Sequence, residues 1–215
     1  MRSGAPTDIR GIMGISPVIC ALTINRIEDA VPLAQALVRG GLPVMYVRLR
    51  TPVALAAIRA IRGTVADAIV GVGTLARPRD FSESAAAGAQ FGVSPGLGIP
   101  YAMDAEFPLL PGIMTPTDLI AARLAGYNAC NLFPAEVAGG VRMIEALSRP
   151  FPDHAFCPTG GVTRASAPAY LALKNVICVG GSWVAPGNLI DAQDWAAIEG
   201  LAKDAAMLRE LKRAS

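Results

Sequence analysis

The sequence contains one histidine, His154, and only three lysines, Lys174, Lys203 and Lys212. A lone imidazole argues against a histidine-ligated zinc centre and against a nucleophile activated by histidine. The four cysteines have no metal-type spacing and fall inside predicted strands, so we expect buried free thiols at Cys20, Cys130, Cys157 and Cys178. We therefore expect neither a metal site nor a bound cofactor.

The chain also lacks a long apolar run and a cluster of charges of one sign. No stretch approaches the length of a membrane span, and the start at 1–8 is too polar for a signal peptide. The formal net charge is only +2 and the arginines are scattered, so we expect no nucleic-acid partner, no membrane partner and a cytoplasmic location. Apolar residues make up 53% of the chain, enough for one large core in a single domain, 1–215.

Short runs rich in β-branched residues alternate with helical patterns along the chain. Strands are predicted near 17–24, 43–50, 67–74, 90–95, 108–113, 128–134, 154–159 and 175–181. Eight strands separated by helices are typical of one α/β fold, the (β/α)8 TIM barrel. We also expect an N-terminal helix and one shortened βα unit at about 98–108, where too few residues remain for a full helix and two loops.

Capping residues and glycines mark the predicted helix ends. Helix starts, each with a capping oxygen or a first-turn proline, are predicted at Asn25, Thr51 and Thr115. Helix ends are predicted at Gly40-Gly41, Gly88 and Gly126, because glycine adopts a left-handed cap easily. The last helix is expected to run from about Asp191 to Arg213.

The predicted strand at 43–50 carries two arginines on one face. Strand side chains alternate, so Tyr46, Arg48 and Arg50 share a face, and the apolar residues between them share the other. Because the apolar face must meet the helices, the polar face is predicted to point into the barrel. Two inward arginines favour a solvated cavity that receives anions. In the alternative interpretation, the arginines only form structural ion pairs with carboxylates at neighbouring strand ends.

Two glycine loops follow the last two predicted strands. They are Thr159-Gly160-Gly161 and Gly180-Gly181-Ser182. Barrels commonly build a phosphate cradle from backbone N–H groups at this point, so we predict that phosphate or sulfate binds here. In the alternative reading, the glycines only make tight turns into the helices.

Three segments together resemble the 2-keto-3-deoxy-6-phosphogluconate (KDPG) and 4-hydroxy-2-oxoglutarate aldolase family. They are Ala129-Cys130-Asn131-Leu132-Phe133-Pro134-Ala135-Glu136, Cys157-Pro158-Thr159-Gly160-Gly161 and Cys178-Val179-Gly180-Gly181-Ser182-Trp183. KDPG aldolases cleave a phosphorylated keto acid to pyruvate and glyceraldehyde 3-phosphate. The resemblance extends from about 16 to 194, and it implies a barrel that assembles as a homotrimer.

The resemblance implies a role for individual positions. Asn131 stands where family members carry the Schiff-base lysine, and Tyr46 stands where they carry the acid/base glutamate. Arg50 matches an arginine that binds the substrate carboxylate, and Thr74 matches a pocket threonine. The glycine loops match the phosphate site. Pro95, which opens the shortened connection, completes the expected substrate-binding residues.

Two further positions depart from the family pattern. Ala21 stands where a larger aliphatic residue is common, and Val72 stands where alanine is common. We expect both side chains to face inward and to change the shape of the cavity. A pocket altered at several positions fits either deliberate redesign or natural divergence.

The substitution at Asn131 bears on the chemistry, because an amide cannot form an imine with a ketone. None of the three lysines is placed to enter the barrel, so native class I aldolase activity is predicted to be lost. The first hypothesis for the function is therefore a remodelled pocket that binds a small phosphate or carboxylate anion. The other two readings are a lysine-independent lyase or proton-transfer enzyme, and a non-catalytic scaffold or assembly subunit.

The second reading assigns chemistry to Tyr46, Arg48 and Glu136, with Asn131 beside them. Tyr46 between arginines could have a lowered pKa and act as proton donor or base. Its ring could equally fill the space left by a glutamate. Glu136 could serve as a base at the mouth of the cavity, or it could cap the next helix.

Overall fold

The computed structural model describes residues 8–97 and 106–213. Its strands pair in parallel and belong to two sheets. The larger sheet, in the order β5-β4-β3-β2-β1-β9, contains β1 Val18–Leu22, β2 Val44–Arg48, β3 Ile69–Gly73, β4 Gly92–Val93, β5 Leu109–Leu110 and β9 Val179–Gly181. The smaller sheet, in the order β6-β7-β8, contains β6 Gly112–Ile113, β7 Ala129–Leu132 and β8 Ala155–Phe156.

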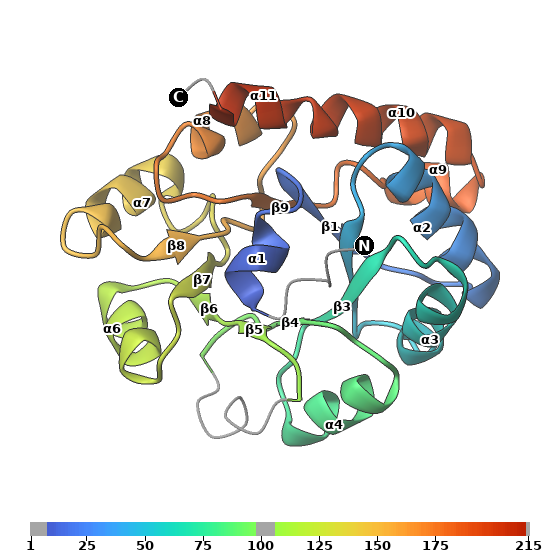
Figure 1. Ribbon diagram of the computed structural model, residues 1–215, viewed down its shortest axis with the longest axis horizontal. Helices are drawn as coiled ribbons and strands as arrows, with labels where there is room; N and C mark the ends of the chain where they lie inside the picture. Colours follow the sequence, from blue (N-terminus) through green and yellow to red (C-terminus); the bar gives the residue numbers. More distant parts are fainter. Residues whose placement is uncertain (1–7, 98–105, 214–215) are drawn as a thin grey trace, which may run out of the picture.

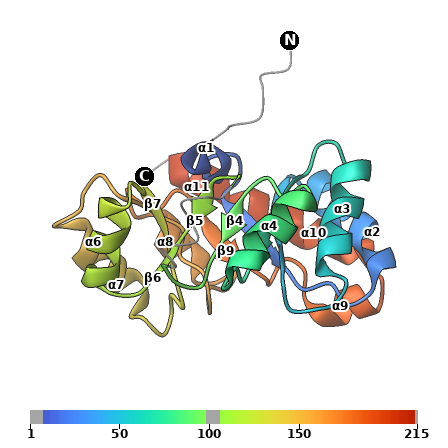
Figure 2. The ribbon, with the colours of Figure 1, turned by 90° about the horizontal axis from the view of Figure 1, so that it is seen from below.

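Helices surround the strands, as Figure 1 shows. They are α1 Ile9–Met13, the 3-10 helix η1 Ile27–Asp29, α2 Ala30–Arg39, α3 Ala54–Thr64, α4 Pro78–Ala86, α6 Pro116–Leu124, α7 Gly140–Ser148, α8 Ala167–Leu171, α9 Gly187–Asp191, α10 Trp195–Ala206 and α11 Leu208–Arg213. The expected N-terminal helix is α1, which lies over one end of the strands in both views (Figures 1 and 2). In the part of the chain that the structure describes, no helix is long and apolar enough to span a bilayer.

The strand predicted at 108–113 is interrupted at Pro111 and forms β5 and β6. The carbonyl oxygen of Leu110 accepts a hydrogen bond from the Ser94 N–H at 3.3 Å, and that of Pro111 accepts one from the Asn131 N–H at 2.8 Å. The carbonyl groups of Leu110 and Pro111 therefore accept hydrogen bonds from segments on opposite sides of this strand. The six-stranded sheet ends at this segment and the three-stranded sheet begins there.

The last two predicted strands are shorter than expected. The strand at 154–159 is reduced to β8, and the strand at 175–181 is reduced to β9. Pro158, two residues after β8, has no N–H to donate toward the 175–181 segment, which interrupts the pairing on that side. On the other side the Thr159 N–H still donates to the Leu132 carbonyl oxygen at 3.0 Å. Two isolated parallel bridges still connect these segments, one joining Phe156 to Val176 and the other joining Thr159 to Gly180.

Buried apolar side chains form two clusters on opposite faces of the strands. The outer cluster joins the helices to residues such as Met45 and Val47. The inner cluster joins α1 to residues such as Val44 and Tyr46, as the alternation along this strand predicted. Val72 belongs to the outer cluster, so its predicted inward orientation is wrong, because the glycines of β3 occupy the inner positions.

The predicted helix ends are confirmed in part. Thr115 caps α6 by accepting a hydrogen bond from the Asp118 N–H at 3.2 Å, and the glycines at 41, 88 and 126 have φ between 86° and 87°. The predicted starts at Asn25 and Thr51 are wrong. The Thr51 hydroxyl instead donates to the Ile24 carbonyl oxygen at 2.6 Å. The last helix begins later than expected and divides into α10 and α11.

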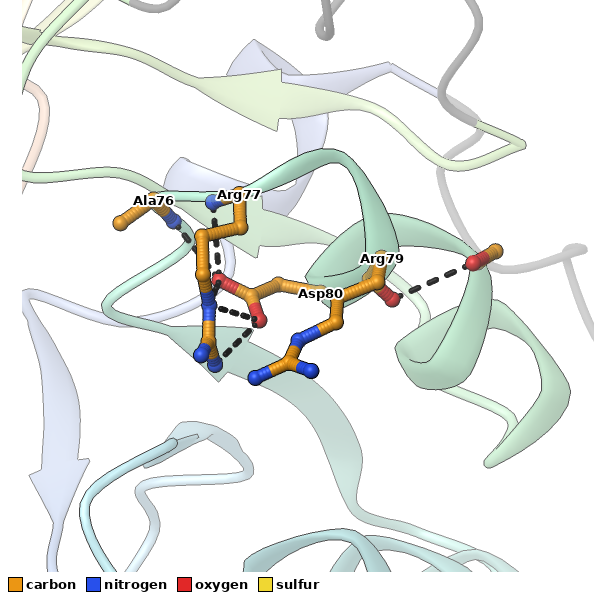
Figure 3. A network of polar contacts seen from close by, with 5 residues as sticks. Ala76, Arg77, Arg79 and Asp80 are labelled. Atoms are coloured by element: carbon orange, nitrogen blue, oxygen red, sulfur yellow. Dashed lines mark hydrogen bonds and ion pairs between the residues drawn. The ribbon is translucent and has the colours of Figure 1, made fainter.

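Helix α4 begins with a compact polar network that the sequence analysis did not identify. The Asp80 carboxylate accepts hydrogen bonds from the N–H groups of Ala76 and Arg77 at 3.0 and 2.9 Å (Figure 3). It also pairs with the Arg77 guanidinium at 2.8 Å. Burial alone would raise the pKa of Asp80, but Arg77 and the two N–H groups hold this pKa below its usual value. The network fixes the turn between β3 and α4.

Candidate functional site

A cavity of about 110 Å³ lies at the carboxyl ends of the strands. Its wall contains most of the residues that the sequence analysis selected, namely Tyr46, Arg48, Arg50, Thr74, Pro95, Asn131, Thr159 and Gly160. They come from the ends of β2, β3, β4 and β7 and from the segment after β8. Parallel strands bring their carboxyl ends to one edge, so residues far apart in the sequence meet there.

Five of the selected residues are absent from this wall, namely Glu136, Gly161, Gly180, Gly181 and Ser182. Three residues that line the cavity were not selected, namely Val93, Ser94 and Phe133. Ser94 and Phe133 directly adjoin selected residues in the sequence. The signal that could have found them is their position at the ends of predicted strands.

Arg48 and Arg50 supply the positive charge of the cavity. An Arg48 nitrogen donates to the Thr23 hydroxyl oxygen at 3.3 Å. Within residues 8–97 and 106–213, neither guanidinium forms an ion pair with a carboxylate. A purely structural role, as ion pairs between strand ends, is therefore not supported for these arginines. Their charge remains available to an anion in the cavity.

Tyr46 is buried beneath the arginines, with 5% of its surface exposed. Its ring packs so closely on Gly73 that a Cβ at that position would clash with it. Burial raises the pKa of Tyr46 to about 12, although Arg48 and Arg50 act in the opposite direction. The lowered pKa that we considered for Tyr46 is therefore wrong. The space-filling role of its ring agrees with the observed packing.

Asn131 extends from β7 and is 2% exposed. Its amide nitrogen donates to the Ser94 carbonyl oxygen at 3.5 Å, at the long limit for a hydrogen bond. Its Oδ1 atom has no hydrogen-bond partner among the described residues. A buried acceptor without a partner is costly, and native proteins rarely tolerate one. The carboxamide of Asn131 in the cavity wall is therefore incompletely hydrogen-bonded within the described chain.

Two of the three lysines have described side chains, and both lie away from this wall. Lys203 on α10 pairs with Glu199 at 2.7 Å, and Lys174 is exposed in the loop after α8. Neither of them lines the cavity. The third, Lys212, belongs to α11.

Thr74 follows β3 with a φ of 68°, in the left-handed region. A β-branched residue rarely adopts this conformation, and such outliers gather at ligand sites. Since Thr74 lines the cavity, its backbone conformation sets the direction of its side chain there.

The first glycine loop has two successive residues in the left-handed region. Gly160 and Gly161 have φ of 93° and 85°, and within the described chain their N–H groups donate to no backbone acceptor. The second loop differs, because the Gly180 N–H donates to the Pro158 carbonyl oxygen at 2.9 Å and is already occupied. Ser182, the last residue of this second loop, is exposed. Its N–H donates to no described backbone oxygen.

Glu136 lies outside the cavity. Its carboxylate accepts a hydrogen bond from the Tyr170 hydroxyl at 2.9 Å, which holds the loop after β7 against α8. The predicted capping role is wrong, because α7 begins at Gly140 with Gly139 as its N-cap. Among the described residues, no group of three or more histidine, cysteine, aspartate or glutamate side chains could hold a metal ion.

The fold and the cavity together define a parallel α/β protein that gathers arginines, an amide and glycine N–H groups at the carboxyl ends of its strands. A model of the "KDPG and KHG aldolase" family matches residues 9–201. The 2-dehydro-3-deoxy-phosphogluconate aldolase of Dickeya dadantii (strain 3937) is 44% identical over 202 residues, which cover 93% of this chain and 95% of that protein. The chain therefore belongs to the KDPG and KHG aldolase family.

Solved structures agree with this assignment. The KDPG aldolase from Legionella pneumophila, with pyruvate captured as a covalent carbinolamine intermediate, is 40% identical and has a TM-score of 0.89. The match covers 92% of this chain and 97% of that one. The aldolase of Zymomonas mobilis ZM4 with 3-phosphoglycerate is also 40% identical with a TM-score of 0.89, covering 94% of this chain and 96% of that one.

Proposed function

We propose that this aldolase-family chain binds a small carboxylate or phosphate anion in the cavity without forming an imine. The observation that carries the proposal is the Asn131 carboxamide in the cavity wall, where the resemblance expects the Schiff-base lysine. An amide nitrogen is not nucleophilic enough to attack a ketone. Neither Lys174 nor Lys203 lines the cavity, and Lys212 belongs to α11, so native class I aldolase activity is lost in this proposal.

Two kinds of group would hold the anion. Arg48 and Arg50, which have no carboxylate partner in the described chain, bind the carboxylate. The unoccupied N–H groups of Gly160 and Gly161 receive the phosphate. The pyruvate and the 3-phosphoglycerate named with the two solved relatives are anions of this class, which supports the choice.

The size of the cavity limits the ligand. A volume of about 110 Å³ is small beside the roughly 300–1,000 Å³ of most small-molecule sites. The enclosed part therefore accommodates a three-carbon keto acid such as pyruvate. A longer phosphorylated acid extends from it toward the exposed residues Gly161 and Ser182. A pocket remodelled in this way fits both natural divergence and engineering.

We also propose that the two sheets close into one (β/α)8 barrel. Three observations support closure: the shared segment of β5 and β6, the bridge between Phe156 and Val176, and the bridge between Thr159 and Gly180. The resemblance to the family further supports a homotrimer. Light scattering on the purified chain tests the trimer, and a monomer would contradict it.

The imine is tested by incubating the chain with pyruvate and borohydride, followed by intact mass measurement. We expect no adduct on the native chain. The comparison is Asn131→Lys together with Tyr46→Glu, which restores both family residues, and we expect a pyruvate adduct there. An adduct on the native chain would overturn the proposal. No adduct on either chain would mean that the surrounding cavity no longer accommodates pyruvate.

Anion binding is tested separately by calorimetry with pyruvate and with inorganic phosphate. Replacing Arg48 with glutamine should weaken pyruvate binding by about tenfold, the value of one charged hydrogen bond. The matched control is Arg79→Gln, because Arg79 is an exposed arginine on α4 outside the cavity wall. Equal affinities for the two variants would contradict the assignment of Arg48.

A lysine-independent lyase or proton-transfer reaction is the second candidate. The observation that favours it is the Tyr46 hydroxyl beside Arg48 in the cavity wall. With a pKa of about 12 the phenol keeps its proton near neutral pH, so it acts as a proton donor rather than a base. Turnover that disappears in Tyr46→Phe would favour this candidate. A chain that neither binds anions nor turns them over would leave the non-catalytic scaffold.

A further inference from the structure

A second, larger cavity lies at the opposite ends of the strands. Its volume is about 630 Å³, within the usual range of small-molecule sites. Arg10 of α1 and Arg123 of α6 line it together with His154, which immediately precedes β8. Residues before strands lie at the amino end of the sheet, so this cavity is separate from the site described above. Figure 1 shows α1 and α6 on either side of β7.

Two guanidinium groups line this cavity, and neither pairs with a carboxylate of the described residues. Arg10 donates to the backbone carbonyl oxygen of Asp153 at 3.4 Å. Arg123 lies over the Phe151 ring, with its guanidinium carbon 5.5 Å from the ring centroid. Asp153 also lines the cavity, and its carboxylate forms no ion pair within the described chain. The local charge therefore favours an anion.

His154 is the second, independent sign of a ligand. The residue is 1% exposed, and neither ring nitrogen has a hydrogen-bond partner among the described residues. Its ring packs against Phe156 with the two centroids 5.3 Å apart. Burial, followed by the charges of Arg123 and Arg10, lowers the pKa of His154 to about 4, so the imidazole is neutral near pH 7. A neutral imidazole has one N–H to donate, and here it is unused.

The remaining wall is apolar and accessible. Ile120 and Leu124 of α6 are 48% and 85% exposed, although both are large aliphatic residues. Together with the Tyr127 and Phe151 rings they form a surface that a carbon skeleton can cover. Inorganic phosphate would leave this surface in water, whereas an organic anion would cover it.

We propose that the cavity lined by Arg10, Arg123 and His154 binds a small organic anion that carries one carboxylate or phosphate on an apolar or aromatic body. The anionic group pairs with the two guanidinium groups and accepts the imidazole N–H. The apolar body packs on Ile120, Leu124 and Tyr127. Nothing in the proposed imine-free function requires this site, so the two proposals stand or fall separately.

The only histidine of the chain makes the site directly observable, because a single imidazole signal reports on it. We would record the His154 ring resonances by NMR while adding phenyl phosphate, with inorganic phosphate as the probe that lacks a carbon skeleton. We expect a saturable shift with phenyl phosphate at lower concentration than with phosphate. The bound anion should also move the ring titration upward from about pH 4, because it favours the imidazolium.

Variants separate this site from the first one. Arg123→Gln should weaken phenyl phosphate binding by about tenfold, and Arg123→Lys should retain part of it. Arg79→Gln is the matched control and should leave the affinity for phenyl phosphate unchanged. Arg48→Gln, which alters the other cavity, should also leave this affinity unchanged. A His154 signal that does not move, or one whose shift disappears in Arg48→Gln, would overturn the proposal. Equal loss in Arg123→Gln and Arg79→Gln would also overturn it.

Discussion

The amide nitrogen of Asn131 donates to the carbonyl oxygen of Ser94 at 3.5 Å, while the Oδ1 atom of the same side chain has no partner in the described chain. One end of the carboxamide is therefore anchored weakly and the other is not anchored. A side chain selected only for packing would not leave a buried acceptor in this state. The arrangement costs stability, and that cost can be measured.

Replacing Asn131 with leucine should leave the free energy of unfolding unchanged or raise it by about 1 kcal/mol. Leucine has a similar volume and removes the unpaired oxygen, and the long bond to Ser94 contributes little. Urea unfolding of the native chain and of the variant checks this expectation. A loss of more than about 2 kcal/mol would mean that Asn131 is better satisfied than the structure indicates. The same variant should bind pyruvate more weakly.

Thr74→Gly should raise the free energy of unfolding by about 1 kcal/mol. A β-branched residue at φ 68° stores about 1–3 kcal/mol of strain, and glycine releases it at an entropic cost of about 0.5–1 kcal/mol. The matched control is Thr117→Gly, on the exposed side of α6, which should instead lower stability by about 0.5 kcal/mol. The same sign for both changes would show that Thr74 is not strained.

Periodicity in the sequence predicts much of the candidate site. Tyr46, Arg48 and Arg50 alternate with apolar residues, and that pattern places them on the inner face, where all three line the cavity. The parallel strands then bring Asn131 and Thr159 to the same edge. These predictions succeed because one face of each strand must meet the helices.

The resemblance to the family, by contrast, gives the wrong face for Val72. In β3 the inner positions include Gly71 and Gly73, and their missing side chains make room for Phe91 and Tyr46. Val72 alternates with these glycines and therefore packs in the outer cluster. The unpaired state of His154 is also invisible in sequence, because it depends on which residues from α1 and α6 lie nearby.

Stability should fall in acid through Asp80. Its pKa is lower in the folded chain than in the unfolded chain, so the folded state is stabilised above the unfolded pKa of about 3.9. That contribution is lost as the pH falls through the folded pKa. Asp80→Ala should therefore lower the free energy of unfolding by about 1–2 kcal/mol at pH 7 and by much less near pH 2.

Asp118 provides the comparison for Asp80. It accepts hydrogen bonds from the N–H groups of Met114 and Thr115 in the same way, but no arginine pairs with it in the described chain. Asp118→Ala should therefore cost less than Asp80→Ala at pH 7. Urea unfolding at both pH values measures the difference, and equal costs would mean that Arg77 contributes nothing.

The packing of Tyr46 on Gly73 gives a prediction with an internal control. Gly73→Ala should lower the free energy of unfolding by about 1–3 kcal/mol, because the added methyl group would overlap the Tyr46 ring and neither strand can move freely. Gly63→Ala, in α3, should instead raise stability by about 0.5–1 kcal/mol, because nothing lies within 4 Å of its added methyl group. Thermal unfolding of the two variants tests both signs. If Gly73→Ala were as stable as Gly63→Ala, the Tyr46 ring would have space to move, and it would then be free to reach a ligand in the cavity.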